Sequence, residues 1–194
     1  LCLAVVLCAR GEIKPLDACK EAQRIEHEVL KTPCGLLDQM AMMYAKQGCA
    51  TLIDFSNNTV VSIDIPNHWT FKLVDSGIHR DLSSTTYSDD NEYLDIHIEE
   101  ENTRVRKAIT ASSQTLGVLL NQSHSSLQKL GVSLPEVDAQ VDALQATEGV
   151  LGARMMGGGF GGMILVLVEN SDILPGIEIV ESSGPALLEE FPES

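Results

Sequence analysis

The sequence predicts an α+β fold in which helices pack on one face of an antiparallel sheet. Segments with strand character, then a long helical stretch, then further strands follow one another along the chain. This order is typical of α+β folds and differs from the regular alternation of βαβ units. With 194 residues, of which 44% are hydrophobic, the chain can bury one sizeable core or two small ones.

Two helices are predicted in the first quarter of the chain. Pro15 suits the first position of a helix, and residues 16–30 follow with apolar side chains at helical spacing. Pro33 and Gly35 interrupt this pattern. Apolar side chains then recur at i, i+3, i+4 and i+7 in residues 36–44, which predicts a second helix.

Three strands and a long loop are predicted next. The segments ATLIDF (50–55), VVSIDI (60–65) and WTFKLVD (69–75) are rich in β-branched and aromatic residues and are separated by turn residues. We expect them to form an antiparallel meander. Residues 76 to about 102 are dominated by Ser, Thr, Asp and Glu, which predicts a loop. A loop of that length is more often functional or mobile than without a role.

The second half is predicted to contain two or three helices followed by strands. Helical spacing returns in residues 105–120 and again in residues 135–144. The chain continues with LGARMM, a glycine cluster and MILVLV (163–168), whose unbroken apolar run predicts a strand buried on both faces. IEIV (177–180) is the last predicted strand.

Charge and cysteine content restrict the partners and the location. The 28 acidic and 13 basic residues give a net charge of -15, which repels nucleic-acid phosphates and anionic lipids. We therefore expect no nucleic-acid partner and no membrane partner. An odd number of cysteines without a C-x-x-C pair favours a reducing, cytoplasmic location. The opening run LCLAVVLCA is far shorter than a membrane span and begins without Met, which indicates a helix that started upstream.

The glycine cluster at residues 157–162 is the most unusual local feature. Five of its six residues are glycines, a composition that weakens any regular element and requires a reason. One interpretation is close backbone packing at a hairpin. The other is an anion cradle, in which backbone NH groups approach phosphate oxygens. A strand follows the cluster rather than a helix, so a dinucleotide-binding fold is rejected.

The segment PCGLLDQ (33–39) offers a candidate catalytic carboxylate. Asp38 falls in the first turn of the second predicted helix, where the helix dipole favours its ionised form. Acidic residues in first turns also simply complement the dipole, and this interpretation stays open.

The segment DSGIHRDLSSTTY (75–87) runs from a strand end into the long polar loop. Loops that leave strand ends often bind ligands, although a solvated loop is the alternative. The histidines form no H-E-x-x-H motif or Cys/His cluster, so we expect no metal ligands in the chain itself.

Taken in order, these segments resemble the second half of galactokinases, which are members of the GHMP small-molecule kinase family. PCGLLDQ is similar to the family's catalytic-aspartate segment, and DSGIHRDLSSTTY to its sugar-contacting loop. GARMMGGGFGG (152–162) resembles its third signature motif, and SLPEVDAQVDAL (133–144) the helix before that motif.

The resemblance implies a GHMP-kinase-like fold with two parts. Residues 1–75 would be the remainder of the N-terminal kinase domain, and residues 76–194 the ferredoxin-like C-terminal domain with the glycine-rich motif. The implied activity is transfer of the γ-phosphoryl group of Mg²⁺-ATP to the anomeric hydroxyl of galactose or a related sugar. This makes the chain a candidate ATP-dependent sugar 1-kinase of galactose metabolism.

The resemblance also implies roles for individual residues. Asp38 would orient or deprotonate the sugar hydroxyl, and Gly35 and Tyr87 would contact the sugar. The cofactor-binding glycines would lie near the transferred phosphate; they are Gly157, Gly158, Gly159, Gly161 and Gly162. The order of His79 and Arg80 differs from the family pattern, so neither receives a role.

The family's N-terminal sugar-binding motif and its Gly/Ser-rich phosphate loop do not occur in these residues. We therefore expect residues 1–194 alone to show little or no turnover. Galactokinase-like proteins that sense a sugar without phosphorylating it provide the alternative hypothesis, a non-catalytic sugar-binding protein. The kinase hypothesis requires Asp38 and the glycine cluster to serve one site, despite their separation in sequence.

Overall fold

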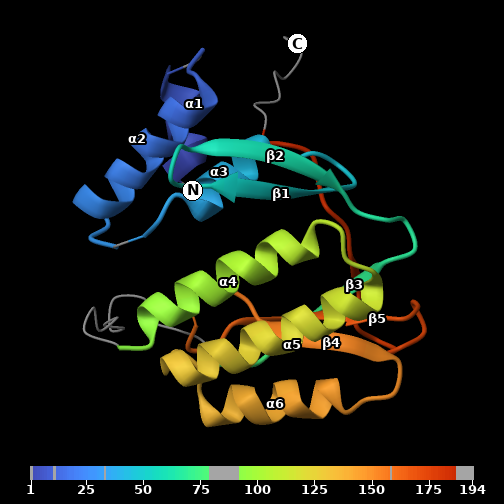
Figure 1. Cartoon of the computed structure of the whole chain (residues 1–194). Helices are drawn as coiled ribbons and strands as arrows, with labels where there is room; N and C mark the ends of the chain where they lie inside the picture. The colour runs from blue at the N-terminus through green and yellow to red at the C-terminus, as the bar shows by residue number, and fades with distance from the viewer. Residues whose placement is uncertain (1, 11, 33, 79–91, 158, 187–194) are drawn as a thin grey trace. The chain divides into compact units, whose positions relative to one another are not determined.

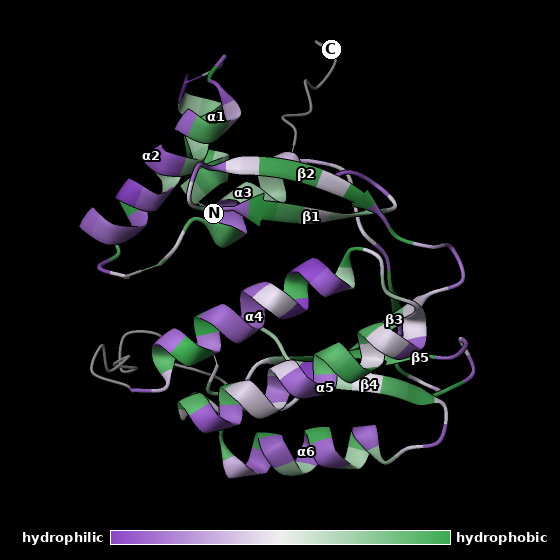
Figure 2. Cartoon of the chain, viewed as in Figure 1, coloured by the Kyte–Doolittle hydropathy of each residue, from purple (hydrophilic) through white to green (hydrophobic). Residues whose placement is uncertain are grey.

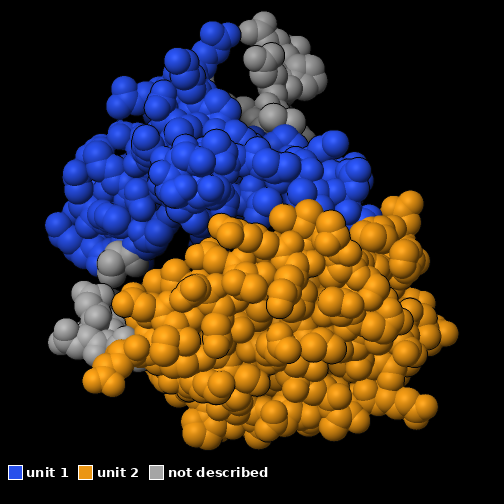
Figure 3. All heavy atoms as spheres, viewed as in Figure 1, with its two compact units in different colours: residues 1–65, 181–194 blue, residues 66–180 orange. Residues whose placement is uncertain are grey.

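The computed structural model describes residues 2–10, 12–32, 34–78, 92–157 and 159–186. It contains two compact units (Figure 3). Unit 1 comprises residues 1–65 and 181–194, and unit 2 comprises residues 66–180. Each unit is described separately below.

The described residues of unit 1 form three helices and a two-stranded antiparallel sheet (Figure 1). Small side chains let the first two helices pack closely, since Ala18 and Ala22 are fully buried against Leu3 and Val6. Pro15, expected at a helix start, occupies the first turn of α2. The elements are α1 (Cys2–Arg10), α2 (Pro15–Glu28), α3 (Leu37–Tyr44), β1 (Cys49–Asp54) and β2 (Thr59–Asp64).

In unit 2, the part of the chain that the structure describes forms a four-stranded antiparallel sheet with helices packed against it. The strand order is β4-β5-β3-β6, and the apolar run predicted to be buried forms β5, which pairs on both sides. The strands are β3 (Thr70–Asp75), β4 (Val150–Met155), β5 (Met163–Val168) and β6 (Ile179–Val180). The helices are α4 (Leu94–Ala108), α5 (Ser113–Leu130) and α6 (Pro135–Gln145).

Two glycines set the spacing between α5 and β4. A Cβ atom on Gly117 would lie 2.1 Å from the carbonyl oxygen of Leu151, and one on Gly152 would lie 2.2 Å from that of Gly117. The helix and strand backbones therefore touch directly. Fully buried Val137 and Val141 of α6 pack in the same core as β4 and β5.

The predicted α+β class, with antiparallel sheets and packed helices, is confirmed. The prediction that the three strands form one antiparallel meander is wrong. Only β1 and β2 pair with each other, because β3 pairs with β5 and β6 in unit 2. Burial explains this choice, since Val74 of β3 packs on the core that contains Ile164 of β5. The compact units accordingly divide between Ile65 and Pro66. The kinase-domain boundary expected after Asp75 stays a prediction.

The predicted loop over residues 76–102 is also wrong at its end, where α4 begins at Leu94. This helix has no buried residue, and its surface is largely hydrophilic (Figure 2). Ion pairs one turn apart support it, with Arg104 lying 3.3 Å from Glu100 and 2.7 Å from Glu101. A charged helix of this kind lacks the apolar spacing by which helices are recognised. No helix in the described ranges has the length and apolar character needed to cross a membrane.

Candidate functional site

The candidate carboxylate, Asp38, lies in unit 1 in the first turn of α3. Its side chain is exposed, and the N-cap residue Leu36 provides no side-chain hydrogen bond to the helix start. A carboxylate in this position is stabilised by the helix dipole and remains open to a ligand. Gly35, also exposed, directly precedes the N-cap.

The turn before Asp38 is held in place by side chains of α2. The Gln23 side-chain amide donates to the carbonyl oxygen of Cys34 at 3.0 Å. The Cys34 amide donates to Nε2 of His27 at 3.1 Å. These bonds fix the backbone that leads into α3, and with it the position of Asp38.

Glu26 forms a second, partly buried anchor of the same turn. Its Oε2 atom accepts hydrogen bonds from the Cys34 thiol at 2.8 Å and from the Gln39 side chain at 2.6 Å. Burial, followed by the hydrogen bond to Glu26 and its charge, raises the pKa of Cys34 to about 11. The thiol therefore stays protonated at neutral pH and acts as a donor rather than a nucleophile.

The glycine loop, residues 156–162, joins β4 to β5 in unit 2. Its backbone is hydrogen-bonded to two other segments of the unit. The Phe160 amide donates to the carbonyl oxygen of Val132 at 2.8 Å, and the Gly162 amide donates to that of Ile78 at 2.9 Å. The Ser76 amide in turn donates to the carbonyl oxygen of Gly162 at 3.0 Å.

Two loop positions require glycine for packing. A Cβ atom on Gly159 would lie 2.3 Å from the carbonyl oxygen of Val132, and one on Gly161 would lie 2.5 Å from that of Ile78. Both residues also have positive φ angles, +99° and +120°. Close backbone packing is therefore one real reason for the cluster.

The anion-cradle interpretation is restricted by the same contacts. The amides of Phe160 and Gly162 already donate to protein carbonyls, so they do not face a ligand as free donors. Gly157 differs, because it is exposed and has open space beside its Cα. It is the described loop residue best placed to approach a phosphate group.

The structure brings two of the three predicted segments together. The start of the segment 75–87 contacts the glycine loop through Ser76 and Ile78. On the other side of Ser76, its carbonyl oxygen accepts a hydrogen bond from the side chain of Gln140 on α6 at 3.0 Å. Asp38 and Gly35 belong to unit 1, so their relation to the loop stays a prediction. Four singled-out residues lie outside the described ranges: His79, Arg80, Tyr87 and Gly158.

Sequence reasoning missed the partners of the glycine loop. Val132 sits in the turn after α5, and its role is carried by a backbone carbonyl, which leaves no side-chain signal. Gln140 lies in α6 among apolar residues that define the helix. The available signal was its position next to Val141 and one turn after Val137, the buried residues of the helix.

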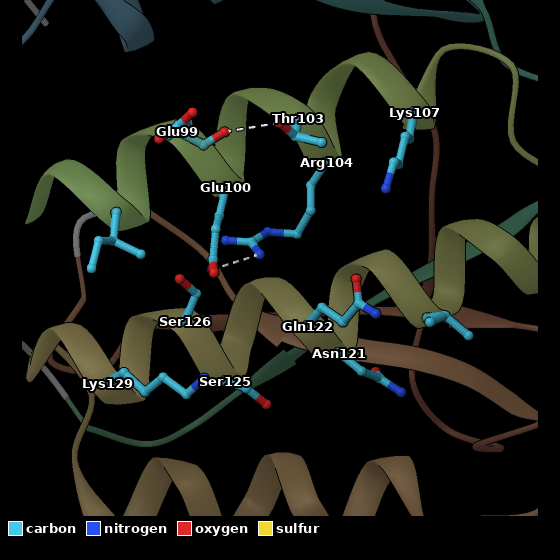
Figure 4. A pocket seen from close by; sticks show the side chains of 12 residues that line it. Glu99, Glu100, Thr103, Arg104, Lys107, Asn121, Gln122, Ser125, Ser126 and Lys129 are labelled. Carbon is cyan, nitrogen blue, oxygen red and sulfur yellow. Dashed lines mark hydrogen bonds and ion pairs between the residues drawn. The ribbon is translucent and has the colours of Figure 1, made fainter. Parts of the chain in front are cut away.

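A surface groove of about 800 Å³ lies between α4 and α5 (Figure 4). Arg104 reaches from α4 toward α5 and pairs with Glu100 within the groove. No residue predicted for the site lines it. Most of the residues that line it are polar or charged, with side chains of both signs. They are Ile96, Glu99, Glu100, Thr103, Arg104, Lys107, Val118, Asn121, Gln122, Ser125, Ser126 and Lys129.

The described residues contain no group of three or more His, Cys, Asp or Glu side chains arranged to hold a metal ion. Mg²⁺ is commonly bound by one or two carboxylates together with substrate phosphates and water. That mode of binding does not require a cluster of protein ligands.

Comparison with known proteins gives the class of the chain. Residues 105–177 match the family model described as GHMP kinases C terminal. The chain is a relative of the GHMP kinases, and unit 2 contains the matched region. This confirms the resemblance and the fold class that the sequence predicted.

Among these kinases, the chain is related to the galactokinases. It is 33% identical over 191 residues to the galactokinase of Thermotoga maritima, a match that covers 80% of this chain and 55% of that protein. The chain thus spans about half the length of the curated relatives it matches.

Solved structures show the same fold at lower identity. The galactokinase of Lactococcus lactis complexed with galactose has a TM-score of 0.62 and 18% identity, covering 86% of this chain and 56% of that one. The mevalonate kinase of L. major in complex with R-mevalonate has a TM-score of 0.64 and 20% identity, covering 95% and 65%.

Proposed function

We propose that this chain is part of a galactokinase-type sugar 1-kinase, which transfers the γ-phosphoryl group of ATP to the anomeric hydroxyl of galactose or a related sugar in the cytoplasm. The observation that carries the proposal is the 33% identity to a galactokinase over most of the chain. The exposed first-turn carboxylate on a firmly anchored turn adds independent support.

Asp38 is assigned the catalytic role. Its carboxylate is exposed, so it can accept a hydrogen bond from the sugar hydroxyl and orient that oxygen for attack. Phosphoryl transfer depends mainly on such positioning and on charge stabilisation. The α2 anchors hold Asp38 in place without using its carboxylate, which leaves both oxygens for the substrate. Gly35 and Tyr87 are assigned to sugar contacts.

The glycine loop is assigned to the phosphate side of the site. The exposed backbone at Gly157 can approach an anion closely because no side chain intervenes. The packed residues Gly159 and Gly161 hold the remainder of the loop rigid. ATP, with Mg²⁺ bound to its phosphates, would supply the transferred group and part of the charge neutralisation. Gly158 and Gly162 complete the proposed set.

An activity assay with a matched pair of variants tests the proposal. The full-length protein that contains residues 1–194 should phosphorylate galactose when ATP and Mg²⁺ are supplied. Asp38→Ala should lower kcat by about 10²-fold or more, as expected for loss of a positioned acid–base group. Asp17→Ala is the control, because Asp17 is an exposed acid in the first turn of α2. It should leave kcat within about twofold, and both variants should keep their fold.

Three results would contradict the proposal. The first is an Asp38→Ala variant as active as Asp17→Ala. The second is an active protein that phosphorylates no sugar. The third is galactose binding without ATP-dependent turnover, which would favour the non-catalytic sugar-binding alternative. Residues 1–194 expressed alone are expected to turn over little.

A further inference from the structure

His124 is a buried polar residue to which the proposed reaction assigns no role. It lies on α5 with 1% of its surface exposed. Burial of an imidazole ring is costly unless its nitrogens have partners. Its surroundings therefore indicate what the ring does.

The ring connects α5 to the end of β4 and to the start of α6. Its Nδ1 atom accepts a long hydrogen bond from the Met155 amide at 3.5 Å. An accepting Nδ1 implies the tautomer with a proton on Nε2. Nε2 lies 3.3 Å from Oδ1 of Asp138, although the pair lacks the alignment of a good hydrogen bond.

The contacts of His124 complete a closed series of interactions that includes the glycine loop. Met155 is the last residue of β4, immediately before the loop. On the far side, the loop amide of Phe160 donates to the carbonyl oxygen of Val132. The next residue, Ser133, donates a hydrogen bond to Oδ1 of Asp138. His124 thus lies between the strand that enters the loop and the turn on which the loop rests.

We propose that neutral His124 is a positioning residue that fixes the glycine loop between Met155 and the Val132 turn. This inference rests on the proposed function, in which the loop serves the phosphate side of the site. The proposal gives His124 no contact with sugar or ATP, and it acts only through the backbone that it holds.

The charges around the ring favour the neutral form required by this role. Desolvation by burial lowers the pKa of His124, and Arg154 of β4 acts in the same direction. Asp138 and Asp142 of α6 oppose the shift without reversing it. Protonation of Nδ1 would convert the acceptor of the Met155 amide into a second donor and break the connection.

Three variants of the gene product separate this role from a general effect on the core. His124→Leu removes both connections, and His124→Asn restores an acceptor near the position of Nδ1. His97→Leu is the control, because His97 is a partly buried histidine that bonds to Ser126 of α5 rather than to β4 or α6. The first measurement is hydrogen exchange at the amides of Phe160 and Gly162, relative to core amides of β5.

Under the proposal, His124→Leu lowers protection of these two amides about tenfold while β5 keeps its protection, as expected for loss of one buried hydrogen bond. His124→Asn recovers most of the lost protection, and His97→Leu changes the protection of neither amide. In wild type, the same protection should fall as the pH drops through the titration of His124. Equal loosening by His97→Leu and His124→Leu, or no recovery in His124→Asn, would overturn the inference.

Kinetics provide the second measurement. His124→Leu should raise the KM for ATP about tenfold and leave the KM for galactose within about twofold, a split that simple destabilisation does not produce. An equal rise in both KM values would count against the inference. Exchange does not require activity, so a wild type without kinase activity would refute the proposed function while the exchange result still decides the role of His124.

Discussion

The turn before Asp38 and the glycine loop use opposite means to hold a backbone in place. Side chains of α2 hold the turn by hydrogen bonds, and Gly35 in the turn and Asp38 after it remain exposed. The loop is held by main-chain hydrogen bonds and direct backbone contact, with Gly159 and Gly161 buried. Substitutions should therefore affect the two regions differently. Substitution of Asp38 should change the rate of phosphoryl transfer more than the free energy of unfolding. Substitution in the packed part of the loop should change the free energy of unfolding more than the rate.

The largest effect on stability is expected within the loop itself. Gly159→Ala places a methyl group 2.3 Å from the carbonyl oxygen of Val132 at a φ of +99°. Overpacking and backbone strain together should cost about 3 kcal/mol. Gly157→Ala is the matched control, because its φ is also positive and its surroundings are open. It should cost about 1 kcal/mol. Urea denaturation measures both, and equal losses would show that the loop is not packed as described.

A smaller effect is expected at the α2 anchor. Glu26→Ala removes the acceptor for Cys34 and for Gln39, which is 3% exposed, and should cost about 1–2 kcal/mol. Because Glu26 helps to raise the pKa of Cys34, the variant should also lower that pKa from about 11. Alkylation of Cys34 by iodoacetamide at pH 8 should then accelerate.

Glu28→Ala provides the control for the anchor. Glu28 lies in the same helix and pairs only with exposed Arg24 among the described contacts. It should leave both stability and alkylation nearly unchanged. Identical alkylation rates in wild type and Glu26→Ala would contradict the assigned hydrogen bond.

A still smaller effect is expected in mild acid, which should lower the stability of unit 2 before that of unit 1. Desolvation lowers the pKa values of His124 and His97 in unit 2, so below the ordinary value of about 6.5 the unfolded state binds more protons than the folded state. The free energy of unfolding of unit 2 should therefore fall as the pH drops from about 6.5 toward the lowered pKa values. In unit 1, the hydrogen bond from Arg24 lowers the pKa of Glu21 to about 2. That contribution is present above about 4.5 and is lost only below it.

Residue-resolved hydrogen exchange at pH 7 and pH 5.5 checks this order. Amides of α5 and β4 should lose protection before those of α1 and α2. His124→Asn combined with His97→Asn should flatten the response of unit 2. Earlier loss in unit 1 would contradict the assignment of the buried histidines as the acid-sensitive groups.

Local patterns predicted much of this architecture. Pro15, the apolar spacing of α6 and the unbroken run of β5 each identified an element correctly. The partner of β3 was not predictable in this way, because it pairs with residues about a hundred positions later and nothing local encodes that choice. The start of α4 was missed because charged pairs such as Arg104 and Glu101 stabilise it in place of an apolar face.

For the candidate site, the sequence supplied the residue types but not their surroundings. Asp38 and the glycines could be singled out by position and composition. The Val132 carbonyl that demands Gly159, and the buried ring of His124, emerge only from tertiary contacts. A backbone carbonyl that accepts a hydrogen bond cannot be recognised from the sequence, because every residue has one.

A double-mutant cycle tests most directly the central claim that Asp38 and the glycine loop serve one phosphoryl-transfer step. The cycle compares kcat/KM for ATP-dependent galactose phosphorylation in wild type, Asp38→Ala, Gly157→Ala and the double variant. Residues that act on the same step are coupled, so the loss in the double variant should be clearly smaller than the product of the single losses. Losses that simply multiply, or a wild type without activity, would contradict the account.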